Sequence, residues 1–345
     1  MLLSQNTEKF DEGKCATEGV HSALTSWLLM ANHAFLLTVT VASFLLTINA
    51  FRMLWRHNIF PNCTRILLLS ALTNGVIHQC TMAEIRVRAI IHAITYSSDP
   101  CSIQFHASEC IAENIFYYFT NIFSSNCLVS LFIDRLLSLR LHSAYSNHQI
   151  LAAIFFMFFQ MGSSVVTMLY VFSGDMLTGY VPMCFYPLPS ILKQFYWMNE
   201  FRMYGLVVVF VLSLAILFHN KHRENRMIHN VYDTESRYKS YESVLTTGAV
   251  CIIISTQVVC LVFASAGTAL LHNLKTKISE PLFHSLLPFL AGLTYSNFFL
   301  PIIISTRTQQ IINQRYKAIG RITLQREGFD EHFAALDISW EAKKT

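Results

Sequence analysis

The sequence predicts an all-α membrane protein, folded as a bundle of seven transmembrane helices. Seven apolar stretches of about 20 residues or more alternate with short polar loops, and this length lets a helix cross a hydrocarbon layer of ~30 Å. Of the 345 residues, 53% are hydrophobic and only 13% are charged, whereas charge makes up about a quarter of an ordinary soluble domain. The stretches cover residues 27–51, 66–93, 110–133, 149–172, 198–219, 248–271 and 282–306.

The positive charges predict the orientation of the bundle. With the N-terminus outside, 17 of the 25 Lys and Arg residues fall on the inner side and five on the outer side. This asymmetry favours an outer N-terminus and an inner C-terminus. We therefore expect an extracellular tail over 1–26, a seven-transmembrane domain over 27–306 and a cytoplasmic tail over 307–345. The formal charge of +4 is largely this inner excess and indicates no nucleic-acid partner.

The tail after Thr306 alternates apolar and basic residues. This pattern predicts a short amphipathic helix that lies on the inner leaflet after the seventh span. Its apolar residues are Ile311, Ile312, Tyr316, Ile319 and Ile322, among the basic residues Arg315, Lys317 and Arg321.

Three of the nine cysteines lie near the outer ends of spans, where disulfides form. A bond between Cys110, at the start of the third span, and Cys184, in the second outer loop, would hold that loop over the bundle. Cys101 competes for Cys184 or pairs with Cys15 in the N-terminal tail. The sequence alone leaves the connectivity open.

The most informative motif is the Asp134–Arg135 pair at the inner end of the third span. A carboxylate can hold a guanidinium by hydrogen bonds in one arrangement of the helices and release it to a cytoplasmic partner in another. The alternative is an interfacial anchor, with Arg135 extending to the lipid headgroups.

The spacing around this pair resembles that of G-protein-coupled receptors. Cys110 precedes Arg135 by 25 residues, a separation typical of rhodopsin-like receptors. More narrowly, Asp134, Arg135, Ser138 and Tyr145 match the offsets of the pattern E-R-x-x-A-x-x-x-x-x-x-Y-E of the nematode Sra superfamily of serpentine chemoreceptors, with its Sra and Srab branches. Asp134 stands in place of Glu, and Ser138 in place of Ala.

A second segment supports the resemblance. Residues 236–243 look like the pattern S-x-R-Y/F-Q-x-x-E-N of the same superfamily, with Arg237, Tyr238 and Glu242 close to register. Lys239 and Ser243 depart from it. The resemblance implies a receptor without a cofactor in the plasma membrane of sensory neurons, which binds a small external cue and activates a heterotrimeric G protein. A helix of that G protein would enter a groove between Arg135, the second inner loop and the basic third inner loop, roughly 220–247.

Polar residues within the second and seventh spans suggest a network. Asn74 lies in the middle of the second span, and Asn297 precedes Pro301 in the seventh. In rhodopsin-like receptors, polar groups at such places repack on activation, while a simple kink at Pro301 is the alternative. The usual motif N-P-x-x-Y is absent here.

The charged residues at membrane depth lie almost entirely in the outer halves of the spans. Charges there are costly, so they face a wet cavity or one another. We take them, with one neighbouring tyrosine, as candidates for the rim of a ligand pocket. Glu84 and Arg88 can pair along one helix, and Glu113 facing Arg86 or Arg202 is a cross-helix alternative. The candidates are Glu84, Arg86, Arg88, Glu113, Tyr117, Glu200 and Arg202.

Three other functions are less well supported. A retinal-binding opsin needs an intramembrane lysine, and the seven predicted spans have none. A metal-dependent intramembrane hydrolase would use His78, His92 and His284, which lack the spacing of ligand pairs. A seven-helix transporter or channel is the better alternative, but the chain shows no internal repeat and no charge near the midplane.

Overall fold

The computed structural model confirms the bundle of seven long helices. It describes residues 15–141, 145, 147–173, 179–187, 191–230, 234–274, 277–290 and 292–341, of which 221, 223–230, 234–242 and 318–341 are described by their backbone alone. Within these residues, seven helices are long and apolar enough to cross a membrane. They are α2 (Trp27–Arg56), α3 (Asn62–Thr95), α4 (Ile111–Arg140), α6 (Gln149–Val171), α7 (Leu192–Asn230), α8 (Thr234–Asn273) and α10 (Gly292–Glu341).

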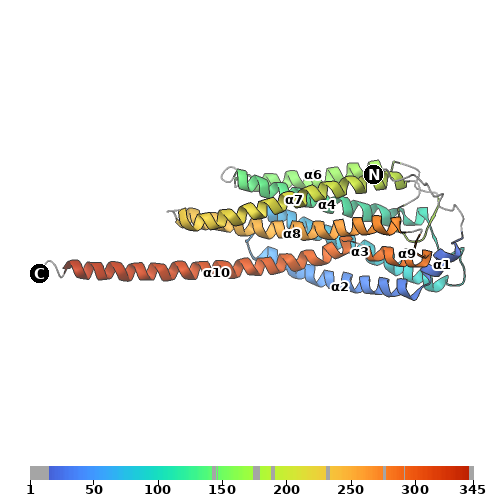
Figure 1. The fold of residues 1–345 in the computed structure, drawn as a ribbon, viewed down its shortest axis with the longest axis horizontal. Helices are drawn as coiled ribbons and strands as arrows, with labels where there is room; N and C mark the ends of the chain where they lie inside the picture. Colours follow the sequence, from blue (N-terminus) through green and yellow to red (C-terminus); the bar gives the residue numbers. More distant parts are fainter. Residues whose placement is uncertain are drawn as a thin grey trace.

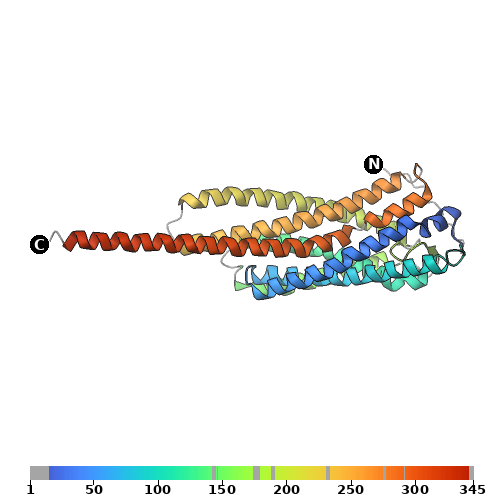
Figure 2. The same cartoon turned by 90° about the horizontal axis from the view of Figure 1, so that it is seen from below.

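The helices pack into a closed bundle around α4. Successive helices α2, α3, α4 and α6 are neighbours, α7 packs on α8, and α10 lies between α8 and α2 (Figures 1 and 2). Because α4 contacts α3, α6, α7 and α8, it occupies the middle of the bundle. Large apolar side chains such as Phe158 and Phe201 point outward, as lipid-facing residues do.

One end of the bundle carries both disulfides, and we call it the disulfide end. Cys110 is bonded to Cys184, the pairing that the sequence favoured, and Cys15 is bonded to Cys101. A two-stranded sheet joins two loops there, with β1 (Phe105–His106) antiparallel to β2 (Tyr180–Val181). A 3-10 helix, η1 (Ala107–Cys110), leads from β1 into α4.

The N-terminal region contributes a helix to the disulfide end that the sequence analysis did not predict. Helix α1 (Glu18–Leu24) begins at Thr17, whose hydroxyl accepts a hydrogen bond from the Val20 amide. It packs on α9 (Glu280–Leu286), so the start and the end of the bundle meet (Figure 1). Its buried side chains, Val20, Ala23 and Leu24, explain the position of this short helix.

The seventh span is divided. It begins as α9, continues as the 3-10 helix η3 (Leu287–Leu290) and resumes as α10. In place of a separate short helix after Thr306, the backbone of α10 continues to Glu341 and projects beyond the other helices at the end opposite the disulfides (Figures 1 and 2). We call this opposite end the Arg135 end, because the charged pair of α4 lies there.

Helix α10 starts in close contact with α8, and Gly292 makes this contact possible. A Cβ atom on Gly292 would lie 2.3 Å from the Ala264 Cβ and 2.6 Å from the Cys260 carbonyl oxygen. A backbone atom cannot move aside as a flexible side chain can. The glycine therefore fixes how closely the two helices approach.

We predict that Gly292→Ala lowers the melting temperature of the purified protein and its yield at the cell surface, because α10 must move away from α8. Gly205→Ala is the matched control. A Cβ on Gly205 in α7 meets nothing within 4 Å, and alanine is favoured over glycine in a helix by roughly 0.5–1 kcal/mol. Equal melting temperatures for the two variants would contradict the close-contact argument.

Candidate functional site

The Asp134–Arg135 pair lies inside the bundle at the Arg135 end. Asp134 is 0% exposed and Arg135 is 1% exposed, so neither side chain extends to the lipid headgroups. Arg135 donates to one carboxylate oxygen, Asp134 Oδ2, from Nε at 3.0 Å and from Nη2 at 2.7 Å. This burial argues against the interfacial anchor.

Two further side chains complete the arrangement. Thr64, in the first turns of α3, donates its hydroxyl to Asp134 Oδ2 at 2.7 Å and accepts a hydrogen bond from Arg135 Nη2. Tyr145, beyond the end of α4, donates to Asp134 Oδ1 at 2.5 Å. Burial, and then the Asp134 carboxylate, raise the pKa of Tyr145 well above its ordinary value, so this hydroxyl stays a donor at neutral pH. Both carboxylate oxygens are therefore occupied.

The sequence predicted three of these four residues. Tyr145 appeared as a match to a family pattern, and its contact with Asp134 gives that match a physical meaning. Thr64 was not predicted, because it is 70 positions from Asp134 in sequence. Arg237, Tyr238 and Glu242 fall in the backbone of α8, and their side chains lie outside the described residues.

The candidate network residues occupy a polar layer in the middle of the bundle. Asn74 donates to the Thr120 carbonyl at 2.9 Å, which ties α3 to α4. Pro301 has no N–H to donate to the carbonyl four residues earlier, that of Asn297. That carbonyl instead accepts the Ser43 hydroxyl at 3.1 Å, and this bond ties α10 to α2.

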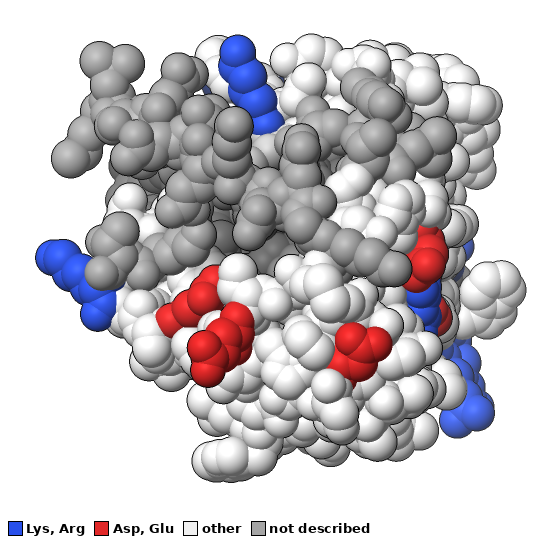
Figure 3. All heavy atoms as spheres, turned by 90° about the vertical axis from the view of Figure 1, so that its right-hand side faces the viewer, with Lys and Arg blue, Asp and Glu red and all other residues white. Residues whose placement is uncertain are grey.

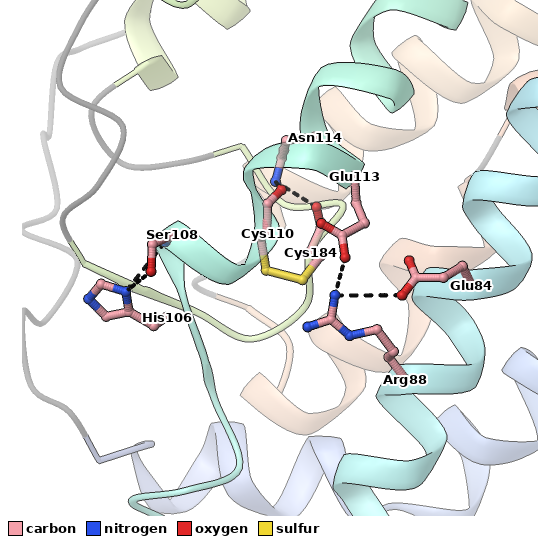
Figure 4. Close-up of a disulfide and its surroundings, with 8 residues drawn as sticks. All are labelled: Glu84, Arg88, His106, Ser108, Cys110, Glu113, Asn114 and Cys184. Atoms are coloured by element: carbon pink, nitrogen blue, oxygen red, sulfur yellow. Dashed lines mark hydrogen bonds and ion pairs between the residues drawn. A yellow bond between two sulfur atoms is a disulfide. The ribbon is translucent and has the colours of Figure 1, made fainter.

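The candidate pocket residues do not form one continuous rim. Arg88 of α3 pairs with Glu113 of α4 and, at 3.5 Å, with Glu84, beside the Cys110–Cys184 bond (Figure 4). Glu113 thus faces Arg88, and neither Arg86 nor Arg202 as the sequence analysis had considered. Glu200 is exposed on α7.

The remaining candidates lie deeper or across the bundle. Arg86 is 1% exposed and donates to Thr40 and Thr294. Arg202 donates to Asn121 Oδ1 at 3.3 Å and Asn199 Oδ1 at 2.8 Å. Tyr117 stacks obliquely on His78, with ring centroids 5.7 Å apart.

The fold and the buried Asp134–Arg135 pair together define a seven-helix membrane receptor. The chain belongs to the serpentine type 7TM GPCR chemoreceptor family Sra, whose family model matches residues 10–340. It is 49% identical to serpentine receptor class alpha-31 of Caenorhabditis elegans over 96% of this chain and 97% of that protein. Serpentine receptor class alpha-29 of the same organism is 47% identical, over 95% and 94% of the two chains. The predicted resemblance to the Sra superfamily is thus confirmed.

We predict that Tyr145→Phe lowers the free energy of unfolding by about 1.5–3 kcal/mol, the contribution of a hydrogen bond to a charged group. The change leaves Asp134 Oδ1 without its donor. The measurement is thermal or denaturant unfolding of the purified receptor in detergent.

Tyr316→Phe is the matched control, because Tyr316 also lies toward the Arg135 end but is 72% exposed. If both phenylalanine variants unfold like the wild type, the Tyr145 hydroxyl contributes nothing measurable to the free energy of unfolding.

Proposed function

We propose that this chemoreceptor binds a small external molecule at the disulfide end and activates a heterotrimeric G protein at the Arg135 end. The disulfide end then faces outward, in the plasma membrane of a sensory neuron. The observation that carries the proposal is the closed cluster of Asp134, Arg135, Thr64 and Tyr145. In this arrangement the Arg135 guanidinium is buried and bonded to Asp134 and Thr64, so it is not available to a partner protein.

The charge distribution supports this orientation. An outward-facing disulfide end follows from the excess of Lys and Arg in the opposite loops, and disulfides form in the oxidising compartment. Figure 3 looks onto the disulfide end, where acidic side chains lie toward the middle of the described surface and the visible Lys and Arg lie at its edges.

Loss of the Thr64 bridge, the first step toward release of Arg135, requires α3 and α4 to move relative to each other. Thr64 belongs to α3, whereas Asp134 and Arg135 belong to α4, so a shift between these helices separates the threonine hydroxyl from both charges. Arg135 Nη1 is buried without a hydrogen-bond partner in the described part of the chain. A carbonyl at the end of a G-protein helix would satisfy such a donor once the groove opens.

We predict that Arg135→Ala reduces ligand-stimulated nucleotide exchange on Gα by at least about tenfold, because the partner loses its buried cationic contact. The assay is GTPγS binding in membranes with receptor levels matched at the surface. Arg56→Ala is the control, since Arg56 is an exposed cation at the same end on α2. An unchanged response of Arg135→Ala would overturn the coupling proposal and direct attention to transport, tested by flux.

We predict that Thr64→Val raises nucleotide exchange in the absence of ligand. Valine has nearly the shape of threonine but cannot bridge Asp134 and Arg135. Loss of about 1.4 kcal/mol from the closed state alone increases the open population roughly tenfold.

Thr38→Val is the matched control for this measurement, because the Thr38 hydroxyl bonds only to its own helix, at the Ala34 carbonyl, 3.0 Å away. Basal exchange equal in Thr64→Val and Thr38→Val would show that Thr64 does not hold the receptor closed.

A further inference from the structure

Arg86 is a buried cation whose hydrogen bonds all go to neutral groups. It lies in α3, in the half of the bundle toward the disulfide end, and is 1% exposed. Its Nη1 donates to Thr40 Oγ1 of α2 at 3.3 Å, and its Nη2 donates to Thr294 Oγ1 of α10 at 3.2 Å. No carboxylate of the described residues lies within ion-pair distance of it, whereas Arg135 has Asp134 and Arg88 has Glu113.

An uncompensated cation at this position is costly to the empty receptor. The guanidinium stays protonated at neutral pH, and hydroxyl dipoles replace only part of the hydration that it loses on burial. Charged residues inside membrane bundles are accordingly paired or lie on a ligand pathway. Arg86 has no ion pair among the described residues, and this points to an anion that comes from outside the chain.

A second cation, Arg202, shares Tyr117 as a neighbour with Arg86. Among the described residues, Arg202 of α7 donates to the side-chain oxygens of Asn121 and Asn199. Tyr117 of α4 lies close enough to Arg86 and to Arg202 to interact electrostatically with both. Two guanidiniums from α3 and α7 thus give the region around Tyr117 a positive potential.

The hydroxyl neighbours of Arg86 are held in place by a glutamine. Gln79 Oε1 accepts the Thr40 hydroxyl at 3.0 Å, and Gln79 Nε2 donates to the Thr294 carbonyl at 3.1 Å. These bonds fix α2 and α10 on either side of the guanidinium. The site around Arg86 is therefore preorganised by three helices.

His33 lies between the Arg86 guanidinium and a small cavity at the disulfide end. This residue is 2% exposed, and neither ring nitrogen has a hydrogen-bond partner among the described residues. It lies near enough to Arg86 to sense its charge, and it lines a cavity at the disulfide end together with His92 and Phe105. That cavity, about 10 Å³, admits roughly one water molecule in the closed receptor.

We propose that the ligand of this receptor is a small carboxylic acid whose carboxylate binds Arg86. A planar guanidinium matches a carboxylate in two parallel hydrogen bonds, and the rings of Tyr117 and His78 beside the site suit an apolar or aromatic body. This inference rests on the proposed receptor function and adds the chemical class of its ligand.

The first test compares acids with their amides. Full-length receptor is purified in neutral detergent without anionic lipid, and its melting temperature is measured with hexanoate, benzoate or phenylacetate and with the corresponding primary amides. We expect at least one acid to raise the melting temperature of the wild type by a few degrees while its amide does not. Arg86→Gln abolishes this shift, and Arg88→Gln, on the same helix but paired with Glu113, retains it.

Three results would overturn the inference from this test. They are equal shifts with acid and amide, a shift that survives in Arg86→Gln, and stabilisation by phosphatidylserine with none from the small acids. The last result would identify a lipid headgroup as the anion.

A second test needs no ligand and keeps Arg86 in place. Thr40→Glu puts a carboxylate beside Arg86, and Thr40→Gln adds a neutral side chain of the same size. We expect the glutamate variant to melt at a higher temperature than the glutamine variant, and the order to reverse when both carry Arg86→Gln. If glutamate melts below glutamine with Arg86 intact, Arg86 does not require an anion and the inference fails.

These measurements use no G protein, so they separate the two proposals. Stabilisation by an acid without nucleotide exchange would leave the ligand class standing and remove G-protein coupling. If no acid stabilises the receptor and Thr40→Glu gains nothing over Thr40→Gln, the ligand class fails while the coupling site is unaffected.

Discussion

The bundle depends on hydrogen bonds that helices make to one another where no water can reach. In the bilayer, every buried polar group needs a partner within the protein, and here the partners come from neighbouring helices. Asn74 reaches the Thr120 carbonyl, Ser43 reaches the Asn297 carbonyl, and Gln257 donates to the Ser296 carbonyl at 2.8 Å. These bonds tie α3 to α4, and α10 to both α2 and α8, in a layer between two apolar clusters.

Pro301 illustrates how this layer is built. A proline within a helix leaves the carbonyl four residues earlier without its donor, and in most proteins this is a local weakness. In α10 the free carbonyl belongs to Asn297 and becomes the acceptor for Ser43 of α2. The Asn297 side chain packs against Gly75, where α3 carries no side chain. A Cβ on Gly75 would lie 3.1 Å from Asn297 Oδ1. The proline thus frees a carbonyl for a contact between helices.

Much of the fold was predictable from the sequence, because the apolar stretch that marks a membrane span is a local pattern. A helix that crosses a bilayer must be apolar over about 20 residues, so the seven spans were found, although the helices extend beyond them at most ends. Helix α1 was missed because its seven residues have no such stretch, and packing on α9 positions it. The partners of the charged side chains were harder to predict, because they depend on how each helix is rotated about its own axis. Glu113 pairs with Arg88, and Thr64 meets Asp134 from a distant part of the chain.

Arg86 and Arg135 lie in opposite halves of the bundle, and they differ in whether a carboxylate pairs with them. This difference relates the proposed ligand site to the proposed G-protein site. Arg135 is paired with Asp134, whereas the part of the chain that the structure describes offers Arg86 no carboxylate. Arg86 and Thr64 belong to the same helix, α3, about 33 Å apart at 1.5 Å per residue. In the mechanism that we propose, an anion bound to Arg86 moves α3, and a packed helix transmits such a movement along its length. The displacement needed at the far end is small, because Thr64 touches both Asp134 and Arg135 and a shift of an ångström breaks hydrogen bonds of this geometry. In this proposal, binding energy at Arg86 is available to withdraw Thr64 from the Asp134–Arg135 pair, with α3 as the rigid connection.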